Sequence, residues 1–314
     1  MSPRHLISIH DLSAREVAGL FRLAAEVKAA PERFHDALSR KTLAMIFQKS
    51  STRTRVSFEA GMAQLGGHAL FLASDLQLGR GETIHDTAQV LSRYVDAVMA
   101  RTFSHQMVLD LARYGTVPVI NGLTDDLHPC QALTDYFTLL EVFGSLEALR
   151  GKKLAYVGDG NNMAHSLMLG AAKVGMDVAV ASPEGYEPRE DYVALARRDA
   201  EAAGTRVEVV RSPREAAAGA ICVYTDVWAS MGQEEAAARR RQDFAGYMVD
   251  SEVMAAAAPE AVFLHCLPCH RGEEVSAEVA DGPQSRIFDQ AENRLHVQKA
   301  VMLWLMGGVE VAGR

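Results

Sequence analysis

The sequence predicts an α/β protein of two domains, each a parallel β-sheet flanked by helices, with the active site in the cleft between the domains. Three observations favour this class. Short apolar segments alternate with helical patterns along most of the chain. The alternation falls into two series that meet near Gly144, and 314 residues are more than one hydrophobic core usually needs. In such sheets ligands gather beyond the carboxyl ends of the strands.

The first series covers residues 1–144. An amphipathic helix begins after a capping box, because Ser13 stands three residues before Glu16 at the start of an apolar repeat. Helical patterns over 82–95 and 104–115 separate apolar segments that are typical of parallel strands. These predicted strands are TLAMIFQ (42–48), HALFLAS (68–74), DAVMAR (96–101) and VPVIN (117–121).

The second series covers residues 145–290, and a long helix predicted from Gln131 to Phe143 precedes it. Five apolar segments in this series read as strands, so we expect a second parallel sheet and a second domain over 145–290. The segments are KLAYVGD (153–159), DVAVASP (177–183), RVEVV (206–210), AICVYTDV (220–227) and AVFLHCLP (261–268).

Composition excludes several classes of protein. Apolar residues make up 48% and charged residues 23% of the chain, as in ordinary globular domains, and the net charge of -8 argues against nucleic acid as the main partner. No apolar run is long enough to span a bilayer, and the N-terminus lacks the apolar core of a signal peptide. Four cysteines are too few for a disulfide scaffold. We therefore expect a cytoplasmic protein with reduced cysteines and no membrane partner.

The segment SSTRTR (50–55) follows the first predicted strand. Serine and threonine cap helix starts, but arginines in a first helical turn oppose the helix dipole unless an anion meets them. Arg53 can bind two oxygens of a phosphate or carboxylate at once. The motif predicts an anion site, with a solvated helix start as the alternative. Arg101, at the end of the strand 96–101, could approach the same point.

His128 and Pro129 stand at the entry to the long helix, with proline at its favoured first position. An imidazole held there can donate a hydrogen bond to a carbonyl oxygen as negative charge builds on it. The alternative is a capping histidine without a chemical role.

The segment VGDGNN (157–162) resembles a dinucleotide fingerprint, because Gly158 and Gly160 follow a strand and open a helix. Met163 occupies the place of the third glycine, which makes the nucleotide signal weak. Asn161 and Asn162 could present amides to a carboxylate, or they could cap the helix.

Two further motifs follow strands of the second series. Asp226 could hold an amino group or cap a helix, and the charged run behind it reads as a solvated face. Zinc and a redox dithiol are alternatives for the segment 265–270, which contains two histidines and two cysteines. No second ligand pair of matching spacing exists elsewhere in the chain, so we favour a Cys266 that faces the cleft, and we predict no metal.

Together these motifs resemble the ornithine branch of the aspartate/ornithine carbamoyltransferase family. SSTRTR and HPCQ are similar to motifs shared by both branches, whereas DVWASMG and HCLP are similar to the ornithine branch alone. The aspartate branch carries a lysine in the loop that corresponds to SDLQLGRGE, where Gln77 stands here. Cys269 matches no family role.

The resemblance implies transfer of a carbamoyl group from carbamoyl phosphate to the δ-amino group of L-ornithine, giving L-citrulline and phosphate in arginine metabolism. It also implies a homotrimer, no cofactor, and a first domain completed by the C-terminal helix at 291–314. The anion residues lie in the first half of the chain and the amino-acid residues in the second. Carbamoyl phosphate would touch both halves, through Arg53 and Cys266, and would favour a closed arrangement that forms the ornithine site. We therefore expect carbamoyl phosphate to bind first.

The resemblance also assigns site residues. Gln77 would reach in from a neighbouring subunit. The implied catalytic residues are Arg101, His128 and Cys266. The implied carbamoyl phosphate ligands are Ser51, Thr52, Arg53, Thr54, Gln77, Arg101, His128, Gln131, Cys266, Leu267 and Arg294. The implied ornithine ligands are Asn162, Asp226, Ser230 and Met231.

Two alternatives from other classes stay open at the level of sequence. An NAD-dependent dehydrogenase would use VGDGNN and bind its cofactor. A non-catalytic anion-binding or regulatory protein would keep STRTR but transfer no carbamoyl group.

Overall fold

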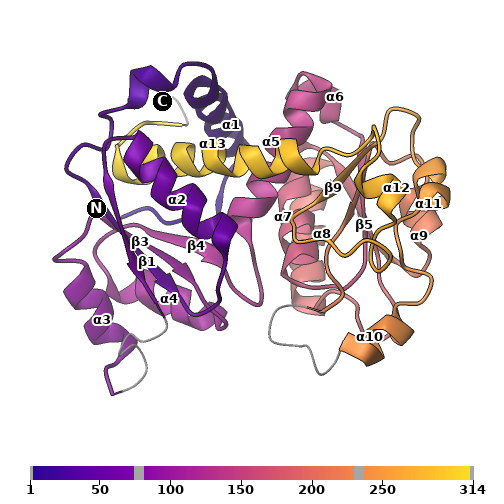
Figure 1. Cartoon of the computed structure of the whole chain (residues 1–314), viewed down its shortest axis with the longest axis horizontal. Helices are drawn as coiled ribbons and strands as arrows, with labels where there is room; N and C mark the ends of the chain where they lie inside the picture. Colours follow the sequence, from indigo (N-terminus) through magenta and orange to yellow (C-terminus); the bar gives the residue numbers. More distant parts are fainter. Residues whose placement is uncertain (1–2, 74–80, 230–236, 312–314) are drawn as a thin grey trace. The chain divides into compact units, whose positions relative to one another are not determined.

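The computed structural model describes residues 3–73, 81–229 and 237–311. The chain divides into two compact units (Figure 1): the N-terminal unit contains residues 1–133 and 293–314, and the C-terminal unit contains residues 134–292. Two helices, α5 (Pro129–Phe143) and α13 (Ile287–Met306), contribute residues to both units. The domain boundary expected at residue 144 stays a prediction.

The N-terminal unit is built on a four-stranded sheet with the order β2-β1-β3-β4, in which every neighbouring pair is parallel. The strands are β1 (Thr42–Phe47), β2 (His68–Leu72), β3 (Ala97–Arg101) and β4 (Val119–Leu123). The helices that belong wholly to this unit are α1 (Ala14–Ala29), α2 (Thr52–Gln64), α3 (Ile84–Leu91) and α4 (His105–Tyr114). Short 3-10 helices occur at Ile9–Asp11 and Pro31–Phe34.

Local sequence explains the ends of these elements. The predicted capping box is present, since the Ser13 side chain accepts from the Glu16 N–H and the Glu16 carboxylate accepts from the Ser13 N–H at 2.8 Å. Strand β1 is buried along Leu43–Phe47, whereas the edge strand β2 leaves Leu70 and Phe71 more than a third exposed. An edge strand has a neighbour on one side only, so its side chains are covered less completely.

Helix α13 lies beside α2 in the N-terminal unit (Figure 1). At Gly61 of α2 an added Cβ would come within 2.9 Å of the Met302 side chain and 3.4 Å of the Lys299 stem, both on α13. The absence of a side chain at Gly61 therefore allows the two helices to approach closely. This contact brings the C-terminal helix next to the helix that follows SSTRTR.

The C-terminal unit is built on a five-stranded, entirely parallel sheet with the order β7-β6-β5-β8-β9. The strands are β5 (Lys153–Val157), β6 (Asp177–Ala181), β7 (Val207–Val210), β8 (Cys222–Thr225) and β9 (Val262–His265). The longer helices are α7 (Asn162–Val174) and α8 (Glu190–Ala203). The shorter helices are α6 (Leu146–Leu149), α9 (Pro213–Ala217), α10 (Ala237–Asp243), α11 (Ser251–Ala256) and α12 (Ala277–Ala280).

The predicted fold class is confirmed, because all nine predicted strands form and both sheets are parallel. Strands β5, β6, β8 and β9 of the C-terminal unit are buried almost throughout, which explains their near-continuous apolar runs. None of the helices in the described ranges combines the length and the apolar character needed to cross a membrane.

Candidate active site

The SSTRTR segment forms the start of helix α2, directly after β1. Ser51 is the N-cap, and its hydroxyl accepts from the Thr54 N–H at 3.2 Å. The first turn contains no acidic residue but does contain two arginines. The predicted helix start is thus correct, and it presents N–H groups and positive charge at the end of a strand.

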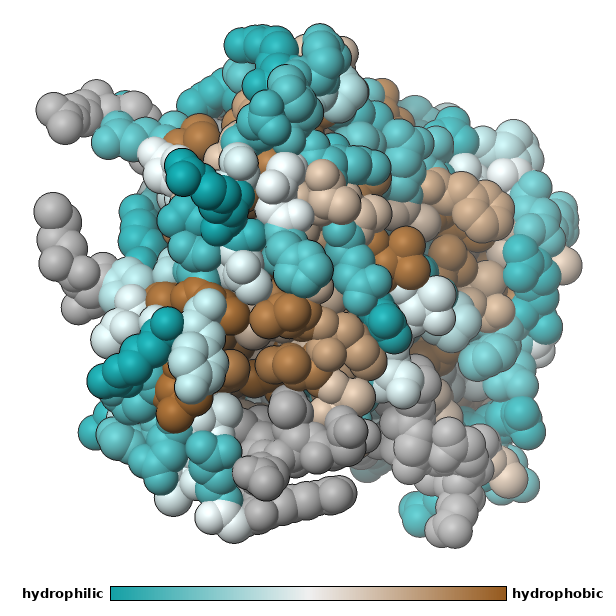
Figure 2. Space-filling model, turned by 60° about the vertical axis from the view of Figure 1, so that its left-hand side comes forward, coloured by the Kyte–Doolittle hydropathy of each residue, from teal (hydrophilic) through white to brown (hydrophobic). Residues whose placement is uncertain are grey.

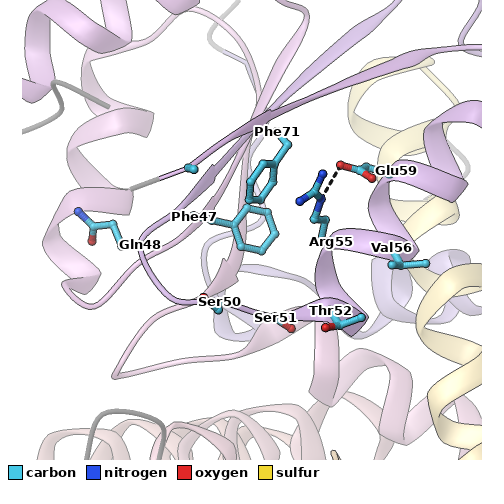
Figure 3. A pocket seen from close by; sticks show the side chains of 10 residues that line it. Phe47, Gln48, Ser50, Ser51, Thr52, Arg55, Val56, Glu59 and Phe71 are labelled. Carbon is cyan, nitrogen blue, oxygen red and sulfur yellow. Dashed lines mark hydrogen bonds and ion pairs between the residues drawn. The ribbon is translucent and has the colours of Figure 1, made fainter. Parts of the chain in front are cut away.

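The two arginines of this turn differ in their surroundings. Arg55 donates from Nε to Glu59 at 2.9 Å, and its guanidinium lies 3.8 Å from the centre of the Phe71 ring (Figure 3). Glu59 neutralises Arg55 one turn along the same helix, so the argument that both arginines need an external anion was wrong for Arg55. Arg53 lies in the same turn, and its side chain is exposed.

Arg294 joins two other predicted ligands. It lies on α13, is only 5% exposed, and donates to the Gln131 amide oxygen at 2.6 Å and to the Thr54 hydroxyl at 3.3 Å. Gln131 and Thr54 are themselves almost fully buried, at the starts of α5 and α2. Residues from three separate parts of the sequence therefore meet within one unit.

His128 lies beside the same group, immediately before Pro129 at the first position of α5. Burial lowers the pKa of His128 well below its ordinary value, and the positive charges of Arg294, Arg101 and Arg53 lower it further. The imidazole is therefore neutral at physiological pH. Because the charges of all three arginines lower the pKa of His128, the three side chains lie near this one imidazole ring.

Arg101 occupies the position that the sequence predicted. It ends β3 and pairs in register with Phe47, the last residue of β1, so the two strands end side by side. Arg53, Thr54, Arg101, His128, Gln131 and Arg294 together form what we call the anion set.

A second set of polar residues lies in the C-terminal unit, at the ends of the neighbouring strands β8 and β9. Asp226 accepts a hydrogen bond from the Cys266 thiol at 3.0 Å and from the Val227 N–H at 2.8 Å with the same oxygen. Its other oxygen accepts from the Asn161 amide at 2.9 Å. We call Asn161, Asn162, Asp226 and Cys266 the amine set.

The Cys266 side chain is a thiol at neutral pH. Burial raises its pKa well above the ordinary value, and the negative charge and hydrogen bond of Asp226 raise it further. The same two causes raise the pKa of Tyr156, which is buried next to Asp226 and Asp159. The carboxylate of Asp226 therefore lies among groups that keep their protons.

The two asparagines have separate roles. Asn161 is the N-cap of α7, because its side-chain oxygen accepts from the Met163 N–H at 2.8 Å, and its NH₂ group is committed to Asp226. Asn162 is the first residue of the helix and is half-buried. Of the two readings left open, capping applies to Asn161, while binding of a carboxylate stays a prediction for Asn162.

The glycine-rich turn before α7 is occupied by the chain itself. The Gly160 N–H donates to the Tyr186 carbonyl at 2.7 Å, and a Cβ at Gly160 would lie 2.0 Å from the nitrogen of Pro188. Gly160 is thus needed because residues 186–188 cross over the turn. This close packing argues against a dinucleotide phosphate at the same place.

The histidines and cysteines of segment 265–270 take separate partners. Among the described residues, ligand atoms close enough for a metal form two groups, one with Asp226, His265 and Cys266 and the other with His270, Glu273 and Glu274. Neither group contains Cys269, whose sulfur accepts from Arg271 at 3.5 Å. The four residues that suggested a zinc site therefore do not converge.

Sequence reasoning missed several contacts. Arg240 was predicted to belong to a solvated charged face, but its guanidinium is largely buried, donates to Asp159 at 2.6 Å and also bonds the Trp228 carbonyl. The interpretation as a solvated face was therefore wrong for Arg240, because a buried carboxylate partner lies 81 residues away in the chain.

Three predicted ligands, Gln77, Ser230 and Met231, lie outside the described residues.

Comparison with known proteins now decides the family. Residues 4–141 match the carbamoyl-P binding domain, and residues 150–305 match the Asp/Orn binding domain, of aspartate/ornithine carbamoyltransferase. The chain belongs to the aspartate/ornithine carbamoyltransferase family.

Similar proteins within this family are named after the ornithine reaction. The chain is 59% identical over 308 residues to an ornithine carbamoyltransferase of Symbiobacterium thermophilum, covering 96% of this chain and 98% of that protein. It is 54% identical to an anabolic ornithine carbamoyltransferase of Pyrococcus furiosus, covering 99% and 98% of the two chains.

Solved structures agree with this assignment. The ornithine carbamoyltransferase from Pyrococcus furiosus superposes with a TM-score of 0.93 at 54% identity, covering 98% of this chain and 99% of that one. An ornithine transcarbamoylase from Giardia lamblia superposes with a TM-score of 0.90 at 34% identity, covering 99% and 100%. The family assignment therefore extends over both units.

Proposed function

We propose that this protein transfers the carbamoyl group of carbamoyl phosphate to the δ-amino group of L-ornithine, producing L-citrulline and phosphate. The observation that carries the proposal is the anion set, in which three arginines surround a neutral histidine at the start of α5. The names of the similar proteins, at 50–59% identity, support ornithine as the acceptor. The anabolic relative supports a place in arginine biosynthesis.

In this proposal the phosphate of carbamoyl phosphate binds at the N-terminus of α2. Ser51, Thr52, Arg53 and Thr54 supply N–H groups, hydroxyls and a guanidinium, and the helix dipole favours the negative charge. Gln77 of a neighbouring subunit completes this part of the site.

The carbamoyl oxygen would face Arg101, His128 and the Thr54 hydroxyl. The Thr54 oxygen accepts from Arg294, which leaves its hydroxyl hydrogen to be donated to the substrate. A neutral His128 can likewise donate one N–H to an oxygen that gains negative charge. These donors would stabilise the tetrahedral oxyanion more than the planar substrate, which is what accelerates the reaction.

The carbamoyl amino group needs hydrogen-bond acceptors. Gln131 can provide one, because an amide oxygen has two lone pairs and can accept from the substrate as well as from Arg294. The carbonyl oxygens of Cys266 and Leu267 would provide the others.

Ornithine would bind to the amine set. Asp226 and Ser230 would hold its α-amino group, and Asn162 with the Met231 backbone would hold its α-carboxylate. The δ-amine must lose a proton before it attacks, since an alkylamine has a pKa near ~10.4 in water. Cys266 lies next to Asp226 and is a thiol, so it would orient the amine by hydrogen bonding rather than remove its proton as a thiolate. After the neutral amine attacks, its nitrogen carries one further proton to lose, and the phosphate that departs as the tetrahedral intermediate collapses can accept this remaining proton.

We also propose that carbamoyl phosphate binds before ornithine. Its proposed ligands belong to both units, whereas those of ornithine belong to the C-terminal unit alone. Binding of norvaline, an ornithine analogue without the δ-amine, should therefore tighten when carbamoyl phosphate is present. Equal affinity with and without carbamoyl phosphate, measured by calorimetry, would refute this order.

A homotrimer is a further part of the proposal. A pocket of about 540 Å³ opens beside the first turn of α2, and Phe47, Val56 and Phe71 contribute apolar side chains to it (Figure 3). Val56 is 54% exposed, and Leu70 and Phe71 on the edge strand are also exposed. Figure 2 shows apolar side chains gathered on one face of the molecule. Exposed apolar clusters of this kind support an interface with another copy.

The expected cytoplasmic location stays a prediction.

The direct test is a measurement of citrulline from carbamoyl phosphate and L-ornithine, with L-aspartate as the competing acceptor. We expect citrulline and no carbamoyl-aspartate. Formation of carbamoyl-aspartate alone would assign the other branch of the family. No transfer to either amino acid, with carbamoyl phosphate still bound, would favour a non-catalytic anion-binding protein.

A further inference from the structure

Strand β9 ends at His265, a fully buried histidine next to the proposed catalytic cysteine. Its Nδ1 lies 2.9 Å from the backbone nitrogen of Leu267, and its Nε2 lies 3.3 Å from a carboxylate oxygen of Glu274. Both Glu274 and His265 are 0% exposed. The ring thus bridges a buried carboxylate and the backbone two residues further along the chain.

We propose that the buried His265–Glu274 pair positions the Cys266–Leu267 segment, and with it the two carbonyl groups assigned to the amino group of carbamoyl phosphate. His265 and Glu274 are positioning residues in this proposal and touch no substrate. The inference rests on the proposed roles of the Cys266 and Leu267 carbonyls, which it deepens.

The hydrogen bonds determine which ring nitrogen of His265 carries the proton. The Leu267 N–H is a donor, so Nδ1 must accept and must be unprotonated. The proton of the neutral ring is then on Nε2, where it is donated to Glu274. An imidazolium, or the opposite tautomer, would place an N–H against the Leu267 N–H and break the contact.

Glu274 is held so that it can accept this proton. The same oxygen accepts from the His270 N–H, and the Glu274 backbone carbonyl accepts from the Val249 N–H at 2.9 Å. Burial raises the pKa of Glu274, but the hydrogen bonds from His265 and His270 outweigh it, and the pKa lies below its usual value. The side chain is therefore a carboxylate that fixes the tautomer of His265.

Leu267 needs such a restraint because of its backbone. Its φ is +60°, a left-handed conformation that residues with a Cβ rarely adopt. The hydrogen bond from its N–H to His265 holds this conformation, which directs the Leu267 carbonyl. The backbone of His265 itself is fixed separately, because its N–H donates to the Gln290 side chain at 3.0 Å. A change of the His265 side chain should thus act on residues 266 and 267.

Two substitutions of His265 separate its two contacts. His265→Asn places an amide oxygen near the position of Nδ1, where it can accept from the N–H two residues on, but it is too short to reach Glu274. His265→Gln can donate to Glu274 but offers no acceptor at the position of Nδ1. We expect His265→Gln to lower kcat about 100-fold, the size of effect that a displacement of reacting groups by about 1 Å can cause. We expect His265→Asn to lower kcat less than about tenfold, because the contact with the Leu267 N–H is kept.

The apparent affinity for ornithine distinguishes positioning from general loss of structure. Both variants should keep the KM for ornithine within about threefold, because Asp226 and Asn162 are untouched, and a urea titration should show equal folded fractions for the two. His270→Ala is the matched control, since it keeps the backbone N–H that bonds the Glu274 oxygen shared with His265, and removes only a half-exposed side chain that lies 3.5 Å from the other Glu274 oxygen. Its kcat should equal that of the wild type.

A nitrogen NMR spectrum of the ¹⁵N-histidine-labelled wild-type protein tests the tautomer without any change of sequence. We expect His265 to carry its proton on Nε2, and Glu274→Ala to remove this preference. A proton on Nδ1 in the wild type, or equal kcat values for His265→Asn and His265→Gln, would overturn the proposal. These results differ from failure of the proposed function, in which the wild-type protein itself would produce no citrulline.

Discussion

The two units share one architecture, a parallel sheet with polar residues beyond its strand ends, yet their candidate ligand sets carry opposite charge. In the N-terminal unit burial and, after it, the positive charges of three arginines lower the pKa of His128 and keep it neutral. In the C-terminal unit the carboxylate of Asp226 and burial keep Cys266 a thiol. In the proposed function the same fold would bind an anion at one set and an amine at the other, and the difference lies in a few side chains at strand ends.

The comparison also concerns how each set is assembled. The anion set is joined by Arg294, which comes from the last helix and bonds residues of α2 and α5. The amine set is joined by Asp226, which bonds residues at the ends of β5 and β9. Each set thus depends on one charged residue that satisfies several polar partners, so removal of that residue leaves buried groups without hydrogen bonds.

The largest expected effect is on the amine set. Asp226→Asn should lower kcat/KM for ornithine by about 1,000-fold, or about 4 kcal/mol, because it removes the carboxylate proposed to hold the α-amino group. Binding of carbamoyl phosphate, measured by calorimetry, should change less than about threefold. If Asp226→Asn weakened both substrates alike, the two sets would not be separate in function.

The second prediction concerns the two arginines of the α2 first turn. Arg53→Ala should weaken phosphate and carbamoyl phosphate binding by roughly 2 to 4 kcal/mol, because it removes a charge-assisted contact to the phosphate. Arg55→Ala is the matched control, since Arg55 already pairs with Glu59 and stacks on Phe71. Calorimetry with inorganic phosphate measures both. Equal losses in the two variants would contradict the assignment of Arg53 to the anion.

The third prediction uses the pKa of His128. Its folded-state pKa lies well below 6.5, so the unfolded chain binds a proton at this position before the folded protein does. The contribution of His128 to stability is therefore present above about pH 6.5 and falls as the pH drops below it, by up to about 1.4 kcal/mol per pH unit.

Urea denaturation at pH 7.5 and pH 5.5 checks this sign. The free energy of unfolding should fall less on acidification in His128→Asn than in the wild type. A larger fall in the variant would mean that His128 is charged in the folded protein, and the neutral donor assigned to the carbamoyl oxygen would be wrong.

The sequence predicted the framework of both units because their central strands are buried and therefore appear as apolar runs between helical repeats. Helix starts at Ser13, Ser51 and Pro129 were also predictable, since caps are local signals of a few residues. The environment of Arg55 was less clear in advance, although Glu59 stands only four residues away, because the dipole argument considered the first turn alone.

Contacts between distant residues were not predictable. The hydrogen bond of Asn161 to Asp226 spans 65 positions, and the ion pair of Arg240 with Asp159 spans 81. No periodicity or spacing indicates such partners in a single sequence. The contact of Glu274 with His265 spans only nine positions, yet no motif in the sequence indicates that Glu274 is buried.

The smallest expected effect sharpens the contrast at the thiol. Asp226 raises the pKa of Cys266 through its charge and hydrogen bond, in addition to burial, so Asp226→Asn should increase the thiolate fraction of Cys266 at pH 8. Alkylation of Cys266 by iodoacetamide, followed by peptide mass spectrometry, should become about threefold to tenfold faster. The larger thiolate fraction increases the rate, and the lower nucleophilicity of a thiolate with a lower pKa offsets part of this increase. Cys269 provides an internal control, because burial raises its pKa and the charge of Arg271 lowers it, whereas Asp226 is not among the causes of its shift. An unchanged rate at Cys266, or an equal increase at Cys269, would show that Asp226 does not stabilise the protonated thiol. The amine set would then lack the effect of a negative charge on its neighbours, which is what distinguishes it from the anion set.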